Sequence, residues 1–171
     1  NFVYSEIDLP LINVLSSIEK NGIKVDTKYL NQLSEEFQKD SLVLEKKIYK
    51  FAGKNFNIGS PKQLGEILFV DLSIQGGKKT KSGTFSTDSS TLSSLSDQGY
   101  EIASLILDWR ELTKLKSTYT DALQNQATKN NSRVHTSYGV ANTLTGRLSS
   151  NDPNLQNIPI RTSNGRKIRK A

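Results

Sequence analysis

The chain has 171 residues, of which 35% are apolar and 23% are charged, and it carries a formal net charge of +6. This length accommodates one domain with a hydrophobic core, or one domain and part of another. Cysteine is absent, which excludes disulfides and thiolate metal sites and is compatible with a reducing cytosol, and no run of 18 apolar residues exists to span a membrane.

Two helices are predicted in the first third of the chain. The first covers residues 8–21, where apolar side chains recur every three or four residues, with Asp8 as the N-cap and Gly22 as the stop. The second has Asp26 as its N-cap and ends before Gly53, and a stripe of leucine, isoleucine and phenylalanine runs along one face. Both patterns are typical of helices packed on neighbouring helices.

A third, shorter helix begins at a predicted capping box. Ser60 is its N-cap, Pro61 occupies the first helical position and Gln63 is placed to complete the box. Residues 73–91 are rich in Gly, Ser and Thr, and this composition predicts a mobile loop. The loop is either a solvated linker or a tip whose lysines contact phosphates; these lysines are Lys78, Lys79 and Lys81.

The second half of the chain is predicted to contain helices followed by strands. Leu92 and Leu95 mark a small helix, and a long amphipathic helix extends from about residue 100 to 125. Residues 133–138 alternate like a strand, and residues 167–171 are predicted to form another strand. The fold class is therefore mainly α (α+β), with a small antiparallel β element.

The positive charge lies at one end of the sequence. Residues 1–99 carry twelve Lys and twelve Asp/Glu, whereas residues 100–171 carry eleven Lys/Arg and five Asp/Glu. From residue 122 onward eight basic residues face a single carboxylate, Asp152. Such asymmetry predicts that one end of the molecule binds a polyanion.

The sequence offers little material for catalysis by the chain itself. His135, Ser137 and Asp152 could be combined on paper into the triad of a small hydrolase, although no nucleophile elbow surrounds them. A two-metal phosphoryl-transfer site needs convergent carboxylates, and the basic half supplies only one. We therefore expect no catalytic residue, no metal site and no cofactor within this chain.

The segment from residue 145 to 161 is better suited to binding. Arg147, Asn154, Gln156 and Asn157 are side chains able to donate to the acceptors that every base pair presents in the minor groove. The alternative is local: the amides cap turns and Arg147 pairs with Asp152. In the long helix, the spacing of Arg110, Lys114 and Ser117 places them on one face.

Five segments together resemble family A DNA polymerases of the bacterial DNA polymerase I type. They are residues 7–26, 56–69 (FNIGSPKQLGEILF), 112–120 (LTKLKSTYT), 133–138 (RVHTSY) and 145–171, which contains TGRLSS and DPNLQNIPIRT. The resemblance covers nearly the whole chain. It implies a thumb subdomain over residues 1–127, with long antiparallel helices and a flexible tip at about 70–91, followed by the start of the palm over 128–171.

The resemblance also implies roles for individual residues. Arg147 resembles the arginine that reaches the minor groove at the primer-terminal base pair, and Asn154, Gln156 and Asn157 resemble the neighbouring amide cluster. The thumb-helix groups that contact the duplex correspond to Arg110, Lys114, Lys116, Ser117 and Thr118. Lys78, Lys79 and Lys81 match the thumb tip, where the contacts go to phosphates.

The chain departs from the family pattern in what it lacks. It ends before the motif with the first metal-binding aspartate, and it begins with Asn instead of Met, so we expect a fragment. The resemblance implies a parent that is a DNA-directed DNA polymerase of replication and repair, a bacterial cytoplasmic monomer using Mg²⁺ and deoxynucleotide triphosphates. The fragment would hold the primer–template duplex. The alternative is a stand-alone DNA-binding accessory module.

Overall fold

The structure is a computed structural model that describes residues 2–80 and 83–171. Lys81, one of the three predicted loop lysines, lies outside the described residues. The chain divides into two compact units that do not follow chain order. The first unit combines residues up to Glu35 with Leu115–Ala171, and the second is Glu36–Lys114.

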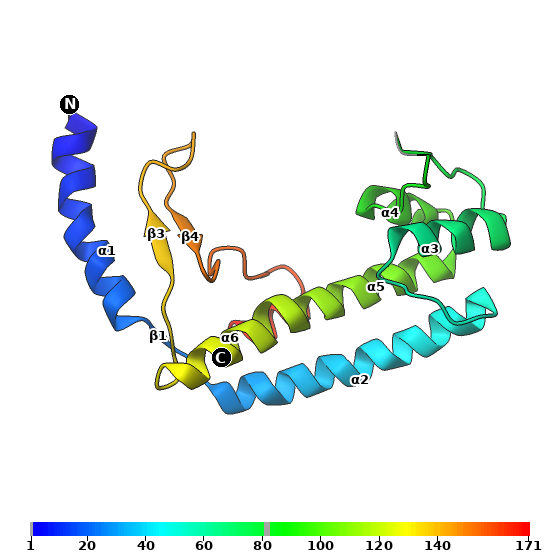
Figure 1. Ribbon diagram of the computed structural model, residues 1–171, viewed down its shortest axis with the longest axis horizontal. Coiled ribbons are helices and arrows are strands. Elements are labelled where there is room, and N and C mark those ends of the chain that lie inside the picture. The colour runs from blue at the N-terminus through cyan, green and yellow to red at the C-terminus, as the bar shows by residue number, and fades with distance from the viewer. Residues whose placement is uncertain (1, 81–82) are drawn as a thin grey trace. The chain divides into compact units, whose positions relative to one another are not determined.

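Helices dominate the described residues, as expected for a mainly α chain (Figure 1). The helical elements are η1 (Val3–Asp8), α1 (Leu9–Asn21), α2 (Thr27–Ala52), α3 (Pro61–Glu66), η2 (Ile67–Asp71), α4 (Ser89–Asp97), α5 (Glu101–Leu115), η3 (Lys116–Asp121), α6 (Ala122–Lys129) and α7 (Ser163–Ile168). The three η elements are π-helical. The strands are β1 (Ile23–Lys24), β2 (Arg133–Val134), β3 (Ser137–Gly139) and β4 (Ser149–Asn151).

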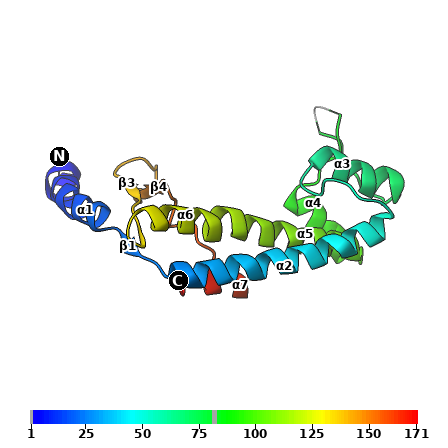
Figure 2. The ribbon, with the colours of Figure 1, turned by 60° about the horizontal axis from the view of Figure 1, so that its bottom comes forward.

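In the first unit, two short antiparallel sheets bring distant parts of the chain together. β1 pairs with β2, with Ile23 opposite Val134, and β3 pairs with β4, with Tyr138 opposite Ser150. The C-terminal residue is bound as well, since the Asp26 N–H donates to the Ala171 carbonyl oxygen at 2.9 Å. The chain end therefore lies at the start of α2 (Figure 2).

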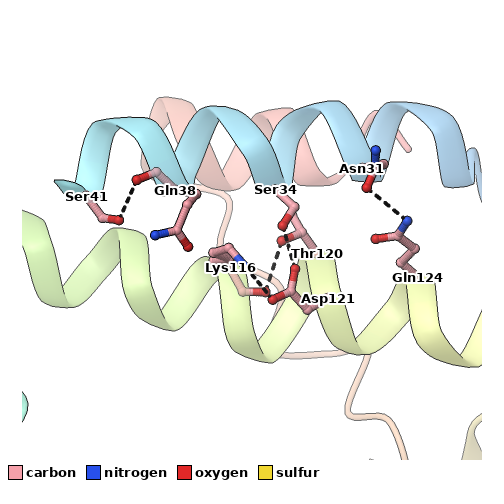
Figure 3. A network of polar contacts seen from close by, with 8 residues as sticks. All are labelled: Asn31, Ser34, Gln38, Ser41, Lys116, Thr120, Asp121 and Gln124. Carbon is pink, nitrogen blue, oxygen red and sulfur yellow. Dashed lines mark hydrogen bonds and ion pairs between the residues drawn. The ribbon is translucent and has the colours of Figure 1, made fainter. Parts of the chain in front are cut away.

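The first unit also contains an antiparallel helix pair. The Ser34 hydroxyl of α2 donates to Asp121, and the Gln124 side chain of α6 donates to Asn31 of α2 (Figure 3). From Ser34 back to Asn31 in α2, the bonded partner advances from Asp121 to Gln124. The two helical segments therefore run in opposite directions. Apolar side chains are buried around this pair: Leu30, Leu33, Leu115, Tyr119, Leu123, Ala127, Val134 and Ile168.

The second unit has its own hydrophobic core. Ile48 from α2, Leu64 from α3, Leu92 from α4 and Ile106 from α5 are each fully buried in one cluster. Burying such side chains contributes about 1.5–3 kcal/mol each relative to exposure. Parts of the apolar stripes predicted from the sequence for the second and the long helix thus meet in this core.

Most predicted helix ends are confirmed, and one is wrong. The Tyr29 N–H donates to Asp26 Oδ1 at 3.0 Å, which confirms Asp26 as the N-cap of α2, and Gly22 ends α1 with φ +63°. Asp8 is not a cap, because it has helical dihedral angles and its side chain makes no capping bond. The helix instead continues back through η1 to Val3.

The capping box at Ser60 is half confirmed. The Gln63 N–H donates to Ser60 Oγ at 3.5 Å, as an N-cap requires. Gln63 Oε1, however, accepts from the Asn57 N–H at 2.8 Å and not from Ser60. The side chain of Gln63 therefore fixes the turn that precedes α3.

Two β predictions need correction. The strand predicted over residues 133–138 is interrupted, with β2 and β3 in different sheets. The strand predicted over 167–171 is wrong, because α7 occupies residues up to Ile168. The Thr162 hydroxyl accepts from the Gly165 N–H at 3.1 Å, and this cap together with the buried side chain of Ile168 favours a helix.

Candidate nucleic-acid interface

The amide cluster lies on a turn that one of its own side chains stabilises. Asn154 Oδ1 accepts from the N–H groups of Gln156 and Asn157, at 3.1 and 3.2 Å. The local alternative, an amide that caps a turn, therefore describes the oxygen of Asn154. All three residues are exposed.

The buried hydroxyl groups of Thr136 and Ser150 form hydrogen bonds with the backbone of this turn. Thr136 Oγ1 lies 2.7 Å from Ser150 Oγ and donates toward the carbonyl oxygens of Asn151 and Pro153, at 2.9 and 2.8 Å. Ser150 Oγ accepts from the Leu155 N–H at 3.1 Å. Both hydroxyl residues are buried. The polar groups of the turn are thus satisfied internally, as buried polar groups must be.

Tyr119 connects the amide turn to η3. Its hydroxyl donates to the backbone carbonyl oxygen of Asn157 at 2.5 Å, and the side chain is buried, which raises the pKa of the phenol. The phenol therefore remains a hydrogen-bond donor throughout the neutral pH range. The sequence does not indicate this contact, because a tyrosine in a helical apolar stripe gives no sign of a partner 38 residues away.

Arg147 lies in an exposed loop between β3 and β4. The backbone is held locally, since Thr143 Oγ1 donates to the Arg147 carbonyl oxygen at 2.7 Å. Among residues 2–80 and 83–171, no ion pair joins the Arg147 guanidinium to Asp152, so the predicted local pairing is not formed. The guanidinium is therefore available for a ligand.

Lys116 is engaged within the protein. Its ammonium donates to Asp121 Oδ2 at 2.7 Å, and Asp121 Oδ1 accepts from Ser34 (Figure 3). Burial opposes ionisation of the Asp121 carboxyl, but the bonds from Lys116 and Ser34 outweigh it and hold its pKa below the ordinary value. The neighbouring side chains of Ser117 and Thr118 are exposed on η3.

The second unit carries the remaining predicted site residues. Lys78, Lys79 and Lys114 are exposed, whereas the side chain of Arg110 is half-buried. The Arg110 guanidinium donates to the Thr87 carbonyl oxygen at 2.5 Å and to Thr87 Oγ1 at 3.3 Å. Helix α4 also begins at Ser89, within the range whose composition predicted a loop.

The hydrolase alternative finds no support in the geometry. His135 Nδ1 lies 2.8 Å from the Glu19 carbonyl oxygen, which makes this nitrogen part of the contact between α1 and the strands. Ser137 is in β3 opposite Asn151. Within the described part of the chain, no hydrogen bond connects His135, Ser137 and Asp152 in the order that a triad requires.

The residues that the structure describes contain no group of three or more His, Cys, Asp or Glu side chains arranged to hold a metal ion. Over the same residues, none of the helices is both long enough and apolar enough to cross a membrane.

Comparison with known proteins gives a consistent result. The family model described as DNA polymerase family A matches residues 27–171. The chain is 53% identical over 169 residues to a DNA polymerase I of Rhizobium leguminosarum, covering 99% of the chain and 17% of that protein. It is 48% identical to a DNA polymerase I of Pseudomonas aeruginosa and 45% identical to one of Bacillus subtilis, each over 169 residues, 99% of the chain and 18% and 19% of those proteins.

A solved structure shows the same fold. The POL domain of Pol1 from M. smegmatis, in complex with DNA primer-template and dNTP, matches with a TM-score of 0.90 and 42% identity. The match covers 99% of this chain and 30% of that one. The chain thus spans about a fifth of the length of the curated relatives that it matches.

Proposed function

The chain belongs to DNA polymerase family A, and we propose that it is the part of a bacterial DNA polymerase I that holds the primer–template duplex. In this proposal, residues 1–127 are the thumb subdomain with its tip at about 70–91, and residues 128–171 begin the palm. The parent would perform template-directed DNA synthesis in the cytoplasm as a monomer. The chain itself would contribute binding and positioning.

The observation that carries the proposal is the exposed loop and turn of the first unit. Arg147, Asn154, Gln156 and Asn157 are exposed and carry donor groups. The backbone of the amide turn is bonded to the buried residues Tyr119 and Ser150, and the Arg147 carbonyl oxygen accepts from Thr143. Donors of this kind suit the minor-groove acceptors that all four base-pair orientations present. Such contacts test the shape of a base pair without reading its sequence, as a general polymerase requires.

Phosphate contacts would be made by exposed groups on the helices and the loop. We assign this role to Lys78, Lys79 and Lys114, with Ser117 and Thr118 as hydroxyl donors. Lys116 is assigned an indirect role, because Asp121 binds its ammonium. Its effect would be to hold η3 in the conformation that exposes its two neighbours.

The catalytic groups of the parent would lie outside this chain. Divalent metal ions, Mg²⁺ in our proposal, would supply charge neutralisation at the transferred phosphate when bound. Because the described residues hold no suitable carboxylate cluster, this chain contributes no ligand to them in the proposal. Deoxynucleotide triphosphates would likewise bind to the complete polymerase.

A stand-alone DNA-binding module is the competing function. The alignment favours the hypothesis that the chain is part of a polymerase, since 99% of the chain aligns within much longer DNA polymerase I sequences. Both hypotheses predict DNA binding, but only the first predicts that the complete protein extends labelled primers.

The test of the binding proposal is a competition between two DNA ligands. The chain is titrated with a labelled primer–template duplex in the presence of either unlabelled duplex or unlabelled single strand of equal length. We expect the duplex to compete more strongly, because minor-groove acceptors in the correct geometry exist only in paired DNA. Equal competition would remove the minor-groove assignment of Arg147 and the amides.

A further inference from the structure

The lysine-bearing loop of the second unit has a defined fold. We call its described residues, 74–80 and 83–88, the tip loop. The Ser86 N–H donates to the Lys78 carbonyl oxygen at 2.7 Å, and a β-bridge pairs Lys79 with Phe85. The outgoing arm, which carries both lysines, is therefore bonded to the returning arm that leads into α4.

The returning arm packs against α3 and η2. The ring of Phe85 lies 5.0 Å from that of Phe69, measured between centroids, and the Lys79 ammonium lies 5.6 Å from the Phe85 centroid. A Cβ added at Gly65 would come within 2.9 Å of Phe85 Cβ, so the glycine permits this close approach. Packing thus fixes Phe85.

Arg110 anchors the next turn of the same arm. Its guanidinium binds both the carbonyl oxygen and the hydroxyl of Thr87, a residue that is only 5% exposed. Burial lowers the pKa of Arg110, and the charge of Asp88 opposes that effect. Asp88 is itself the N-cap of α4, accepting from the Thr91 N–H at 2.7 Å. Arg110 therefore contacts the junction between the tip loop and α4.

We propose that Arg110 is a positioning residue for Lys78 and Lys79 and not itself a DNA contact. The connection is short: Arg110 binds Thr87, and the adjacent Ser86 binds the backbone of Lys78. The role of the lysines in DNA binding rests on the proposed function, whereas the anchoring of the loop does not. Holding the loop before DNA binds removes part of the ordering cost that a free loop would incur on binding.

The test uses the full chain and five variants, the fifth of which combines two of the others. Arg110→Ala removes the anchor, and Arg110→Lys keeps one donor for the Thr87 carbonyl oxygen. Lys78→Ala combined with Lys79→Ala removes the positioned charges. Lys62→Ala is the control, because Lys62 is an exposed cation of the same unit at the start of α3.

Two quantities are measured for each protein. Amide hydrogen exchange at Ser86 reports whether the returning arm stays bonded to Lys78, and exchange at Ile106 reports the stability of the core. The salt dependence of affinity for a primer–template duplex reports the number of phosphates neutralised. Arg110→Ala is also combined with the double lysine variant to form a thermodynamic cycle.

We expect Arg110→Ala to speed exchange at Ser86 about tenfold without a matching change at Ile106, and Arg110→Lys to restore part of the protection. We also expect Arg110→Ala to weaken duplex binding in the wild-type background but not in the double lysine background. Unchanged exchange at Ser86 would overturn the proposal. Equal weakening in both backgrounds would overturn it too, because Arg110 would then act on DNA by itself.

The exchange measurement keeps this inference separate from the proposed function. If the wild-type chain did not bind the duplex, the DNA-binding proposal for the isolated chain would fail. Exchange at Ser86 would still decide whether Arg110 fixes the lysine-bearing arm.

Discussion

The phenolic hydroxyl of Tyr119 donates a 2.5 Å hydrogen bond to the backbone carbonyl oxygen of Asn157. Tyr119 belongs to η3, the same π-helical segment as Ser117 and Thr118, and Asn157 belongs to the amide turn. The bond therefore joins two groups of proposed DNA contacts that are 38 residues apart. One buried side chain thus bonds the two groups within the first unit.

Replacing Tyr119 by Phe removes this bond while keeping the ring. The Asn157 carbonyl oxygen would lose its donor, and we expect a loss of about 1 kcal/mol in unfolding free energy. Duplex affinity should also fall, because the amide turn is no longer fixed. Urea unfolding and duplex titration measure the two effects.

Tyr49→Phe is the matched control for that experiment. The Tyr49 hydroxyl also donates to a backbone carbonyl oxygen, that of Phe56 at 3.0 Å, and it lies in the second unit. Burial and the bond with Glu45 raise the pKa of Tyr49 to about 12. This variant should lose stability with little change in affinity. If Tyr49→Phe lost as much duplex affinity as Tyr119→Phe, the loss of affinity in both variants would be explained by reduced stability alone.

Ser150→Ala tests the buried hydroxyl pair beneath the amide turn. The change leaves the Leu155 N–H and the Thr136 hydroxyl with fewer partners in a buried environment. We expect a loss of about 1–3 kcal/mol in unfolding free energy. Ser137→Ala, at an exposed position in β3, serves as the control and should change stability by no more than about 0.5 kcal/mol. Similar small losses for both variants would contradict the assigned role of the pair.

The Asp121 carboxyl should make stability depend on acid pH. Its pKa is lowered in the folded chain, so the stabilisation is complete above the unfolded value of 3.8 and is lost as the pH falls through the folded value. Asp121→Asn should therefore be less stable than wild type near neutral pH, and the difference should shrink below about pH 4. Melting temperatures from pH 3 to 7 measure this.

Asp97→Asn is the control for the titration, because Asp97 is an exposed carboxylate at the end of α4. The same pH series for Asp97→Asn measures how removing one exposed negative charge changes the melting temperature. A difference for Asp121→Asn that does not change with pH would contradict the assigned bonds to Lys116 and Ser34.

Arg147 is expected to position the primer-terminal base pair in the complete polymerase. Arg147→Ala should lower kcat/KM for nucleotide insertion about ten- to hundredfold, equivalent to about 1.4–2.8 kcal/mol. Arg147→Lys keeps the charge but not the planar fork and should recover only part of the loss. Single-nucleotide extension of a labelled primer gives the rates. Wild-type rates in both variants would exclude Arg147 from the mechanism.

The helices are the part of the fold that could be predicted from the sequence, because their apolar side chains recur with helical periodicity. The stripe in α2 and the stripe that continues from α5 into η3 and α6 are local patterns, and most of their side chains are buried as expected, whereas Phe51 at the end of α2 is 45% exposed. Caps such as Asp26 and Ser60 were predictable for the same reason, since each bonds an N–H three residues away. Local chemistry determines both features.

Long-range contacts explain what the sequence did not indicate. The helix α7 replaces a predicted strand: its Thr162 cap is as local as those of Asp26 and Ser60, but the burial of Ile168, which also favours the helix, does not follow from the short alternating pattern at the C-terminal end. Arg110 shares a helix face with Lys114 in the sequence, yet its guanidinium is bound to Thr87, 23 residues away. Spacing along one helix gives no information about such a partner.

The most direct test of the central claim is the salt dependence of duplex binding by the chain. We predict a log–log slope of about −3 or steeper, since each phosphate neutralised contributes about −0.9. Converting Lys78, Lys79 and Lys114, the three proposed phosphate contacts, to alanine should flatten the slope by about 2.7, whereas the same change at the exposed residues Lys28, Lys39 and Lys62 should leave it nearly unchanged. Absence of binding at low salt, or equal flattening by both triple variants, would contradict the claim that these side chains hold the duplex.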